Sequence, residues 1–225
     1  MLLSGGIDSA TCLYMEKKRG HNLSTLTFAY MGIAPKELEA ARAVRRSAGV
    51  REHRVVRLPD LREARDIAGV KFERLPPTYI PMRNAIFYSI AASFAEEIGA
   101  DYIVGGHNKD DMTVFRDVSP QFFASFEKAL WEGSRILSGH GTRIVRPLGS
   151  RTKAEVVRLA DSMDVPLSVT WSCHRDGSFH CWRCEGCLAR LRAFNRAGIA
   201  DPLRILTSTG KSLKTRRGSV GQIGR

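Results

Sequence analysis

Two patterns of hydrophobic and polar positions alternate along the chain, one with the period of strands and one with the period of helices. Strands are predicted at 1–3, 23–30, 52–58, 102–104 and 143–145, and helices at 9–19, 35–49, 84–98, 120–132, 153–163 and 188–197. Asn84 is the expected N-cap of its helix and Gly99 the residue that ends it. This order predicts an α/β fold, a doubly wound, Rossmann-like parallel sheet with helices on both faces.

Two patterns that resemble functional ones are interpreted as packing. Phe122, Phe126 and Leu130 recur at helical spacing, which indicates a core face rather than a stacking platform. Cys12 stands on an apolar helix face and is expected to be a buried thiol. The segment 59–81, which contains Pro76-Pro77, is long for a connection, and we expect it to be functional or partly helical.

In a doubly wound sheet, ligands bind at the carboxyl ends of the strands, so the first loop after a strand is the first place to examine. Its sequence is SGGIDS, residues 4–9. The two glycines let the backbone turn sharply and approach an anion, and free N–H groups at the start of the next helix favour phosphate oxygens. Ser4 and Ser9 add hydroxyl donors. Asp8 cannot hold phosphate and is expected to orient the loop or to help bind Mg²⁺.

Four of the five cysteines fall within fifteen residues, at Cys173, Cys181, Cys184 and Cys187. In a cytosolic protein such spacing is more typical of a metal site than of disulfides. Four thiolates close a tetrahedral shell around Zn²⁺ and leave no place for water, which predicts a structural site. An iron–sulfur cluster is the competing assignment. His174 or His180 is an alternative ligand in place of one cysteine.

Charge is the unusual part of the composition, with a net charge of +12 in 225 residues that are 43% hydrophobic. A disordered chain and a membrane span are excluded, since no apolar run approaches the roughly 20 residues that a span needs. No basic start or cleavage-like site follows Met1, so we expect a cytoplasmic protein without a signal peptide. The end of the chain carries no acid after Asp201 and six cations: Arg204, Lys211, Lys214, Arg216, Arg217 and Arg225. This tail is predicted to be flexible, as a solubilising extension or an RNA contact.

The SGGIDS string at a strand–helix junction resembles the signature of the PP-loop ATP pyrophosphatase superfamily. Together with the cysteine set it resembles the 7-cyano-7-deazaguanine synthases, the nitrile-forming enzymes of queuosine and archaeosine biosynthesis. The likeness runs from Leu2 to about Ala197. It rests on residues 3–9, 81–84 (PMRN), Gly106 with Asp111, 146–148 (RPL) followed by Lys153, 170–173 (TWSC), and the cysteines ending at Cys187.

The resemblance implies an ATP-dependent C–N ligase that uses ATP and Mg²⁺ to convert 7-carboxy-7-deazaguanine and ammonia to 7-cyano-7-deazaguanine. AMP is first transferred to the carboxylate, and ammonia displaces it to give an amide. A second adenylation, now of the amide oxygen, followed by loss of AMP gives the nitrile. The resemblance also implies a homodimer that acts on small molecules. Direct tRNA binding is not expected, although the basic tail leaves it open.

The resemblance assigns roles to particular residues. ATP is expected on Leu3, Ser4, Gly5, Gly6, Ile7, Asp8 and Ser9. Lys153 is the candidate cation at the α-phosphate and, with Asp8, the candidate catalytic group; Arg83 is a candidate for substrate or nucleotide phosphates. A solvated surface position is the alternative for both Lys153 and Arg83. Asp111 and Asp117 are expected to accept hydrogen bonds from the deazaguanine base.

One stretch departs from the family pattern. After the fourth strand the family usually carries Asp-x-Ser-Gly-Tyr-Pro-Asp-Cys-Arg, whereas residues 111–119 read DMTVFRDVS. Both acids are kept, but the tyrosine is Phe115 and the final arginine is Ser119. The departure concerns the acceptor more than the ATP chemistry.

The predicted organisation is a PP-loop domain at 1–165, a zinc-binding segment at 166–200 and a basic tail at 201–225. The main alternative function is a PP-loop enzyme that adenylates a tRNA base for thiolation or amine transfer, which the net charge favours and the closed four-cysteine set disfavours. A zinc-stabilised RNA-binding module without enzymatic activity is the third reading, and the intact phosphate loop argues against it.

Overall fold

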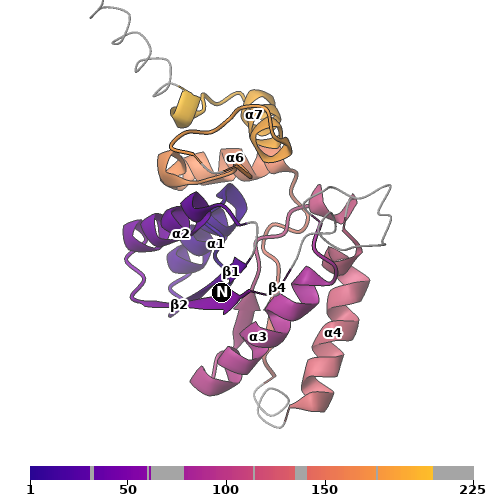
Figure 1. Ribbon diagram of the computed structural model, residues 1–225. Coiled ribbons are helices and arrows are strands. Elements are labelled where there is room, and N and C mark those ends of the chain that lie inside the picture. Colours follow the sequence, from indigo (N-terminus) through magenta and orange to yellow (C-terminus); the bar gives the residue numbers. More distant parts are fainter. Residues whose placement is uncertain are drawn as a thin grey trace, which may run out of the picture.

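The computed structural model describes residues 1–30, 33–59, 61, 79–113, 115–134, 141–175 and 177–204 (Figure 1). The helices are α1 (Ile7–Lys18), α2 (Pro35–Ser47), α3 (Arg83–Ile98), α4 (Pro120–Gly133), α6 (Lys153–Ser162) and α7 (Glu185–Ala197). The strands are β1 (Ser24–Tyr30), β2 (Glu52–Leu58), β3 (Tyr102–Val104) and β4 (Arg143–Val145), and short 3-10 turns are η2 (Asp111–Thr113), η3 (Arg116–Val118) and η4 (Leu167–Val169). Every helix predicted from the sequence is present, although α7 begins three residues earlier than expected.

The sheet is parallel and is completed by residues 1–3. β1 pairs with β2 from Ser24 opposite Glu52 onward, and β3 pairs with β4. Between these two pairs, Leu2 forms a parallel bridge with Leu26, and its N–H donates to the Val104 carbonyl at 2.9 Å. The spatial order is therefore β2, β1, residues 1–3, β3, β4. From residues 1–3 the chain adds β1 and β2 on one side of the sheet and then β3 and β4 on the other side. This change of side falls between residues 1–3 and β3, and doubly wound sheets bind ligands at such a point.

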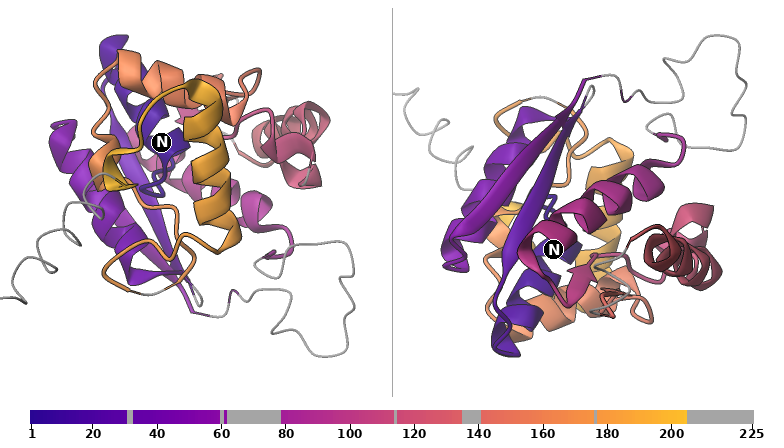
Figure 2. Two further views of the ribbon diagram at one scale, coloured as in Figure 1. Left: turned by 90° about the horizontal axis from the view of Figure 1, so that it is seen from above. Right: turned by 90° about the horizontal axis from the view of Figure 1, so that it is seen from below.

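Helices cover both faces of this sheet, as Figure 2 shows. On one face, α1 and α2 enclose a core that includes Leu3, Ile7 and Cys12. On the other, α3 and α4 enclose a second core around Phe28 and Tyr88. The doubly wound prediction is confirmed. So are the two packing assignments, because Cys12 is fully buried and the stripe Phe122, Phe126 and Leu130 packs against the second core.

The cysteine-bearing end of the chain packs on the first face. α6 lies against α1, and α7 lies against α6, as the stacked helices of Figure 1 show. A buried ion pair fixes this end, since Arg190 donates through Nε and Nη2 to both carboxylate oxygens of Asp201, at 2.7 and 2.9 Å. Its Nη1 donates to Thr170 Oγ1 at 2.8 Å. Among the helices that the structure describes, none is long and apolar enough to cross a membrane.

The predicted N-cap of α3 is wrong. Met82, in the left-handed region at φ 52°, precedes the helix, and Asn84 is its second residue. The Asn84 N–H donates instead to Asp117 Oδ2 of η3 at 3.1 Å. The cap comes from a side chain 33 residues away in sequence, which a local pattern does not reveal. The stop at Gly99 is confirmed, with φ 64°. The long segment at 62–78, Val114 and the tail from 205 onward lie outside the described residues.

Candidate functional site

Two glycines let the phosphate loop sit where it does, one within the loop and one opposite it. Gly5 has φ 81°, and a Cβ there would lie 2.4 Å from the backbone nitrogen of Ala41 in α2. Gly106, in the loop after β3, faces the start of α1, and its Cβ would lie 2.8 Å from the nitrogen of Ser9. Both distances are shorter than any ordinary carbon contact. The loop is therefore clamped between α2 and the end of β3 only because neither position carries a side chain.

The loop holds its own shape through serine hydroxyls and presents the start of α1. Ser4 Oγ and Ser9 Oγ lie 3.0 Å apart, and Gly6 N–H donates to Ser4 Oγ at 3.3 Å. Gly6 is the N-cap of α1 and offers no side-chain cap. The first-turn amides of α1 are therefore left without a side-chain cap, and together with the positive end of the helix dipole they suit the anion that the sequence predicts here. Leu3 and Ile7 have buried side chains, so their contribution to a nucleotide is limited to the backbone.

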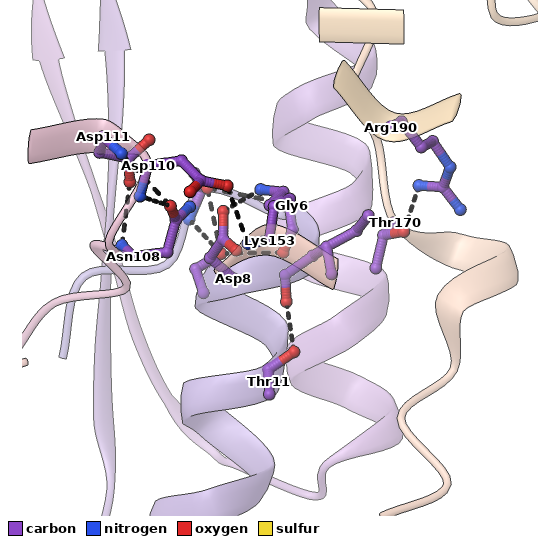
Figure 3. A network of polar contacts seen from close by, with 12 residues as sticks. Gly6, Asp8, Thr11, Asn108, Asp110, Asp111, Lys153, Thr170 and Arg190 are labelled. Carbon is purple, nitrogen blue, oxygen red and sulfur yellow. Dashed lines mark hydrogen bonds and ion pairs between the residues drawn. The ribbon is translucent and has the colours of Figure 1, made fainter. Parts of the chain in front are cut away.

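A polar network of carboxylates joins the loop to α6 (Figure 3). Lys153, the first residue of α6, forms an ion pair through Nζ with Asp8 Oδ2. Its backbone N–H donates to Asp110 Oδ2 at 3.0 Å. Asn108 ties the acids together, since its N–H donates to Asp111 Oδ2 at 3.0 Å and its Oδ1 accepts from Asp110 N–H at 2.8 Å. The predicted residues Asp8, Lys153 and Asp111 thus lie in one network.

Asp8 is the electrostatic centre of this network. Burial raises the pKa of its carboxyl, Lys153 opposes that shift, and the nearby Asp111 adds to it. Its Oδ1 is buried and has no hydrogen-bond partner. A buried carboxylate oxygen without a partner beside a second carboxylate is the donor set that a hard divalent cation prefers. The residues present therefore fit Mg²⁺.

Two joined cavities open over the loop. The smaller, about 390 Å³, is bounded by Leu26 and Phe28 of β1, Phe87 of α3 and the Gly105–His107 turn. The larger, about 790 Å³, is bounded by the Lys153 network and by α7. Residues common to both walls are Ser4, Glu37, Arg83 and His174. Arg83 thus lies in the wall of both cavities, and its role as a phosphate- or substrate-binding cation stays a prediction.

The two acids predicted to bind the base are placed differently. Asp111 lines the larger cavity. Asp117 is buried, and one of its oxygens caps α3. The structure also adds residues that the sequence reasoning missed, namely Asn108, Asp110 and His107, and it places His174, which was considered only as a metal ligand, on the cavity walls. The first three follow β3 directly, and that position at a strand end was the signal that would have found them.

The four cysteine sulfurs converge on one point. All four Sγ atoms lie within 4.8 Å of one another, with Cys173–Cys184 at 3.8 Å and Cys181–Cys187 at 3.9 Å. Sulfurs about 2.3 Å from a tetrahedral ion stand about 3.8 Å apart, so the set fits a single metal ion. Backbone amides also point at the sulfurs, as at Cys184 N–H to Cys181 Sγ, 3.3 Å.

Neither flanking histidine joins that ligand set. His180 Nε2 accepts from Ser172 N–H at 3.1 Å, and its ring stacks on Trp182 and is tilted by 50° against Trp171. His174 faces the joined cavities. The alternative in which a histidine replaces one cysteine finds no support among the described residues.

The metal centre and the phosphate loop are directly connected. Trp171 N–H donates to the Gly5 carbonyl at 2.9 Å, and Trp171 Nε1 donates to the Cys173 carbonyl at 2.7 Å. Gly186 lies under this connection, where a Cβ would be 2.1 Å from the Ser172 carbonyl. The cysteine segment therefore buttresses the back of the phosphate loop.

A phosphate loop at the switch point of a doubly wound sheet, backed by a four-cysteine centre, is consistent with the resemblance found in the sequence. The family model described as "Queuosine biosynthesis protein QueC" matches residues 1–198. The chain belongs to the QueC family. That match contains the loop, the Asp8–Lys153 network and all four metal-site cysteines.

Three curated relatives of this QueC-family chain are named 7-cyano-7-deazaguanine synthase. A 7-cyano-7-deazaguanine synthase of Acetivibrio thermocellus is 35% identical over 217 residues, covering 93% of this chain and 98% of the relative. That of Thermosynechococcus vestitus is 37% identical, covering 90% and 93%. The synthase of Thermoplasma acidophilum is 36% identical, covering 90% of each.

Proposed function

We propose that this chain is an ATP-dependent ligase that converts 7-carboxy-7-deazaguanine and ammonia to 7-cyano-7-deazaguanine. The observation that carries the proposal is the Asp8–Lys153 pair set beside the phosphate loop at the switch point, with two joined cavities over it. That arrangement offers one place for a triphosphate and a second for an acid, with a cation between them. The name shared by these relatives gives the product, 7-cyano-7-deazaguanine, and the family resemblance of the sequence implies the acid from which it is made.

In the proposed reaction the phosphate loop holds the nucleotide by its α- and β-phosphates. Loop amides and the start of α1 carry the negative charge, and Lys153 neutralises charge on the α-phosphate as the carboxylate attacks. Asp8 positions Lys153, and Asp8 and Asp111 are the residues that would hold Mg²⁺, which would supply charge neutralisation for the leaving pyrophosphate. Arg83 orients the acid or the phosphates at the junction of the cavities. Most of the rate gain comes from positioning and charge stabilisation, because adenylation needs no covalent group from the protein.

The second adenylation uses the same groups on the amide oxygen. Ammonia must reach the acyl-adenylate before water does, so the cavity must admit a small neutral nucleophile while hydrolysis is slow. Loss of AMP from the activated amide then leaves the nitrile. Because one site performs both rounds, a variant that weakens α-phosphate contacts should slow both in proportion.

We further propose that the cysteine centre holds Zn²⁺ in a structural role and that two chains form a dimer. The 3.8–3.9 Å sulfur separations support a single ion, since an iron–sulfur cubane carries its cysteines on separate irons. Zinc supplies no chemistry to the reaction and instead fixes the segment that leads to Trp171. Metal analysis and light scattering on purified protein test these two statements.

Mass spectrometry tests the main proposal. The protein is incubated with ATP, Mg²⁺, ammonium and 7-carboxy-7-deazaguanine, and the expected result is the nitrile together with AMP and pyrophosphate. The amide should accumulate transiently, and Lys153→Met should form neither product at a comparable rate. Release of AMP that does not depend on the acid, or no AMP at all, would contradict the proposal.

A further inference from the structure

The turn that follows β3 contains a histidine whose hydrogen bonding is incomplete. His107 lines the smaller cavity, and its Nε2 is buried without a hydrogen-bond partner. Buried polar atoms in proteins are nearly always paired, so an unpaired one on a residue that lines a cavity points to a ligand that pairs with it. None of the roles described above for the phosphate loop, the Lys153 network or the metal centre uses this side chain.

Packing holds the ring in this position. The His107 ring lies 5.8 Å from the Tyr88 ring and 5.6 Å from the Phe123 ring, between centroids. Gly105 allows this arrangement, because a Cβ there would overlap the Tyr88 hydroxyl at 1.7 Å and approach the His107 ring at 3.2 Å. The aromatic contacts fix the orientation of the imidazole, so its nitrogen is presented in one direction rather than swinging freely.

The imidazole is neutral at physiological pH. Burial lowers the pKa of His107 to about 4, and Arg83 and Arg146 add to the effect, while Asp117 and Asp8 oppose it. A neutral imidazole offers one N–H donor and one acceptor nitrogen, and it places no charge beside a neutral heterocycle. That is a suitable partner for the polar edge of a base.

The other groups expected to recognise a base are less available for hydrogen bonding. Asp117 uses one carboxylate oxygen to cap α3, and the family's tyrosine and arginine are replaced by Phe115 and Ser119. The smaller cavity also has flat apolar walls, with the Phe28 and Phe87 rings stacked at 3.9 Å. A flat heterocycle bounded by such walls would leave its edge for a polar contact.

We propose that His107 Nε2 hydrogen-bonds the edge of a purine-like base bound in the smaller cavity. The inference rests on the proposed function, in which two such bases take part, the adenine of ATP and the deazaguanine of the acceptor. The shared chemistry is a heteroaromatic edge with a ring nitrogen, an amine or a carbonyl oxygen. The experiment separates the two sources.

His107→Phe removes the nitrogens and keeps the ring that packs on Tyr88 and Phe123. Calorimetry is performed in two arms, one with α,β-methylene-ATP and Mg²⁺ and one with 7-carboxy-7-deazaguanine. We expect about ten-fold weaker binding in one arm, which identifies the base, and partial recovery in His107→Gln, which restores a donor and an acceptor. The midpoint of thermal unfolding of His107→Phe should equal or exceed that of the wild type, because an unpaired buried nitrogen is lost.

The matched control is His53→Phe. His53, on β2, also has a buried Nε2 without a partner, but it lies outside both cavities. Its substitution should leave both affinities unchanged.

Unchanged affinity in both arms for His107→Phe would overturn the inference. Weaker binding that accompanies a lower unfolding midpoint, without recovery in His107→Gln, would overturn it as well, since packing alone would then explain the loss. Product formation by the wild type is followed in parallel. If no nitrile forms but His107→Phe weakens nucleotide binding, the proposed function fails and the histidine contact stands.

Discussion

The phosphate-loop region and the cysteine segment differ in whether their buried polar atoms have hydrogen-bond partners. Around the loop, Asp8 Oδ1 and His107 Nε2 are buried without partners, and α1 begins without a side-chain cap. In the cysteine segment, Arg190 is fully buried with its guanidinium donating to Asp201, Thr170 and the Leu167 carbonyl, and four sulfurs share one point. Unpaired buried groups cost stability, and those that line a cavity over the phosphate loop are candidates for ligand contacts, whereas paired groups stabilise the fold.

This contrast gives a rule for substitutions. A change in the cysteine segment should act mainly on stability and reach activity through Trp171, which joins the segment to the Gly5 carbonyl. A change at the loop should act mainly on ligand binding and catalysis. The predictions below test whether that division holds.

The largest effect is expected from Cys187→Ser. In the proposed zinc site, loss of one thiolate would open the tetrahedral shell and remove an ion that contributes folding energy, so the segment should lose its metal and its fold. Metal analysis should fall from one ion per chain to well below one, and thermal unfolding should begin at a clearly lower temperature. Cys12→Ala is the control, since Cys12 is buried in the first core and outside the metal set. Full metal content and activity in Cys187→Ser would refute the structural role.

Arg190→Met tests the satisfied ion pair next. The change leaves the Asp201 carboxylate buried without its partner, which typically costs about 3–5 kcal/mol. Chemical denaturation measures the free energy of unfolding. A double variant, Arg190→Met with Asp201→Asn, should recover part of the loss because it removes the stranded charge. Lys36→Met, at an exposed ion pair, should cost less than about 1 kcal/mol.

Lys153→Met tests the phosphate-loop region. Removing a cation that stabilises developing charge typically lowers the rate about 10²–10³-fold. Stability should fall less than for Arg190→Met, because Asp8 is a carboxyl whose pKa burial already raises and which takes up a proton when its partner is lost. Single-turnover AMP release measures the rate, and denaturation of the same sample measures the free energy of unfolding. A variant with normal turnover and a large loss of stability would reverse the division of roles between the two regions.

Features encoded by residues close together in the sequence could be predicted, whereas features formed by residues that only the fold brings together could not. The alternation of strands and helices and the clustering of the cysteines are encoded in residues close together in sequence, and the predicted fold class and a four-cysteine cluster are both found in the structure. The cap of α3 was not predicted correctly, because Asp117 reaches it from a distant part of the chain. The unpaired nitrogen of His107 was invisible for the same reason, since pairing is a property of neighbours that only the fold brings together. Site roles for Arg83 and Asp111 stay predictions that their placement makes testable.

The pH dependence of stability distinguishes an unpaired histidine from a paired one. Burial lowers the pKa of His107 to about 4, below the ordinary value of 6.5. Between those values the unfolded chain binds a proton that the folded chain does not, so stability falls as pH falls from about 6.5 to about 4. His107→Phe removes this contribution, and its advantage in unfolding free energy over the wild type should widen by up to about 1.4 kcal/mol per pH unit. An advantage that stays constant between pH 7 and pH 4.5 would show that His107 takes up its proton as readily in the folded chain as in the unfolded one, which contradicts the lowered pKa.

The smallest effect is expected from Asp117→Ala. This residue shares features with both the phosphate-loop region and the cysteine segment. Asp117 is buried and hydrogen-bonded, like the polar groups of the cysteine segment. It also caps α3, the helix whose first residue, Arg83, lines the cavities over the phosphate loop. Loss of the cap should cost about 1 kcal/mol of unfolding free energy. If that is its whole role, Asp117→Asn, which keeps an acceptor oxygen for the Asn84 N–H, should restore both stability and the affinity for 7-carboxy-7-deazaguanine. If the asparagine variant restores stability but not affinity, the second carboxylate oxygen contacts the base, and Asp117 acts as a ligand-binding group as well as a cap.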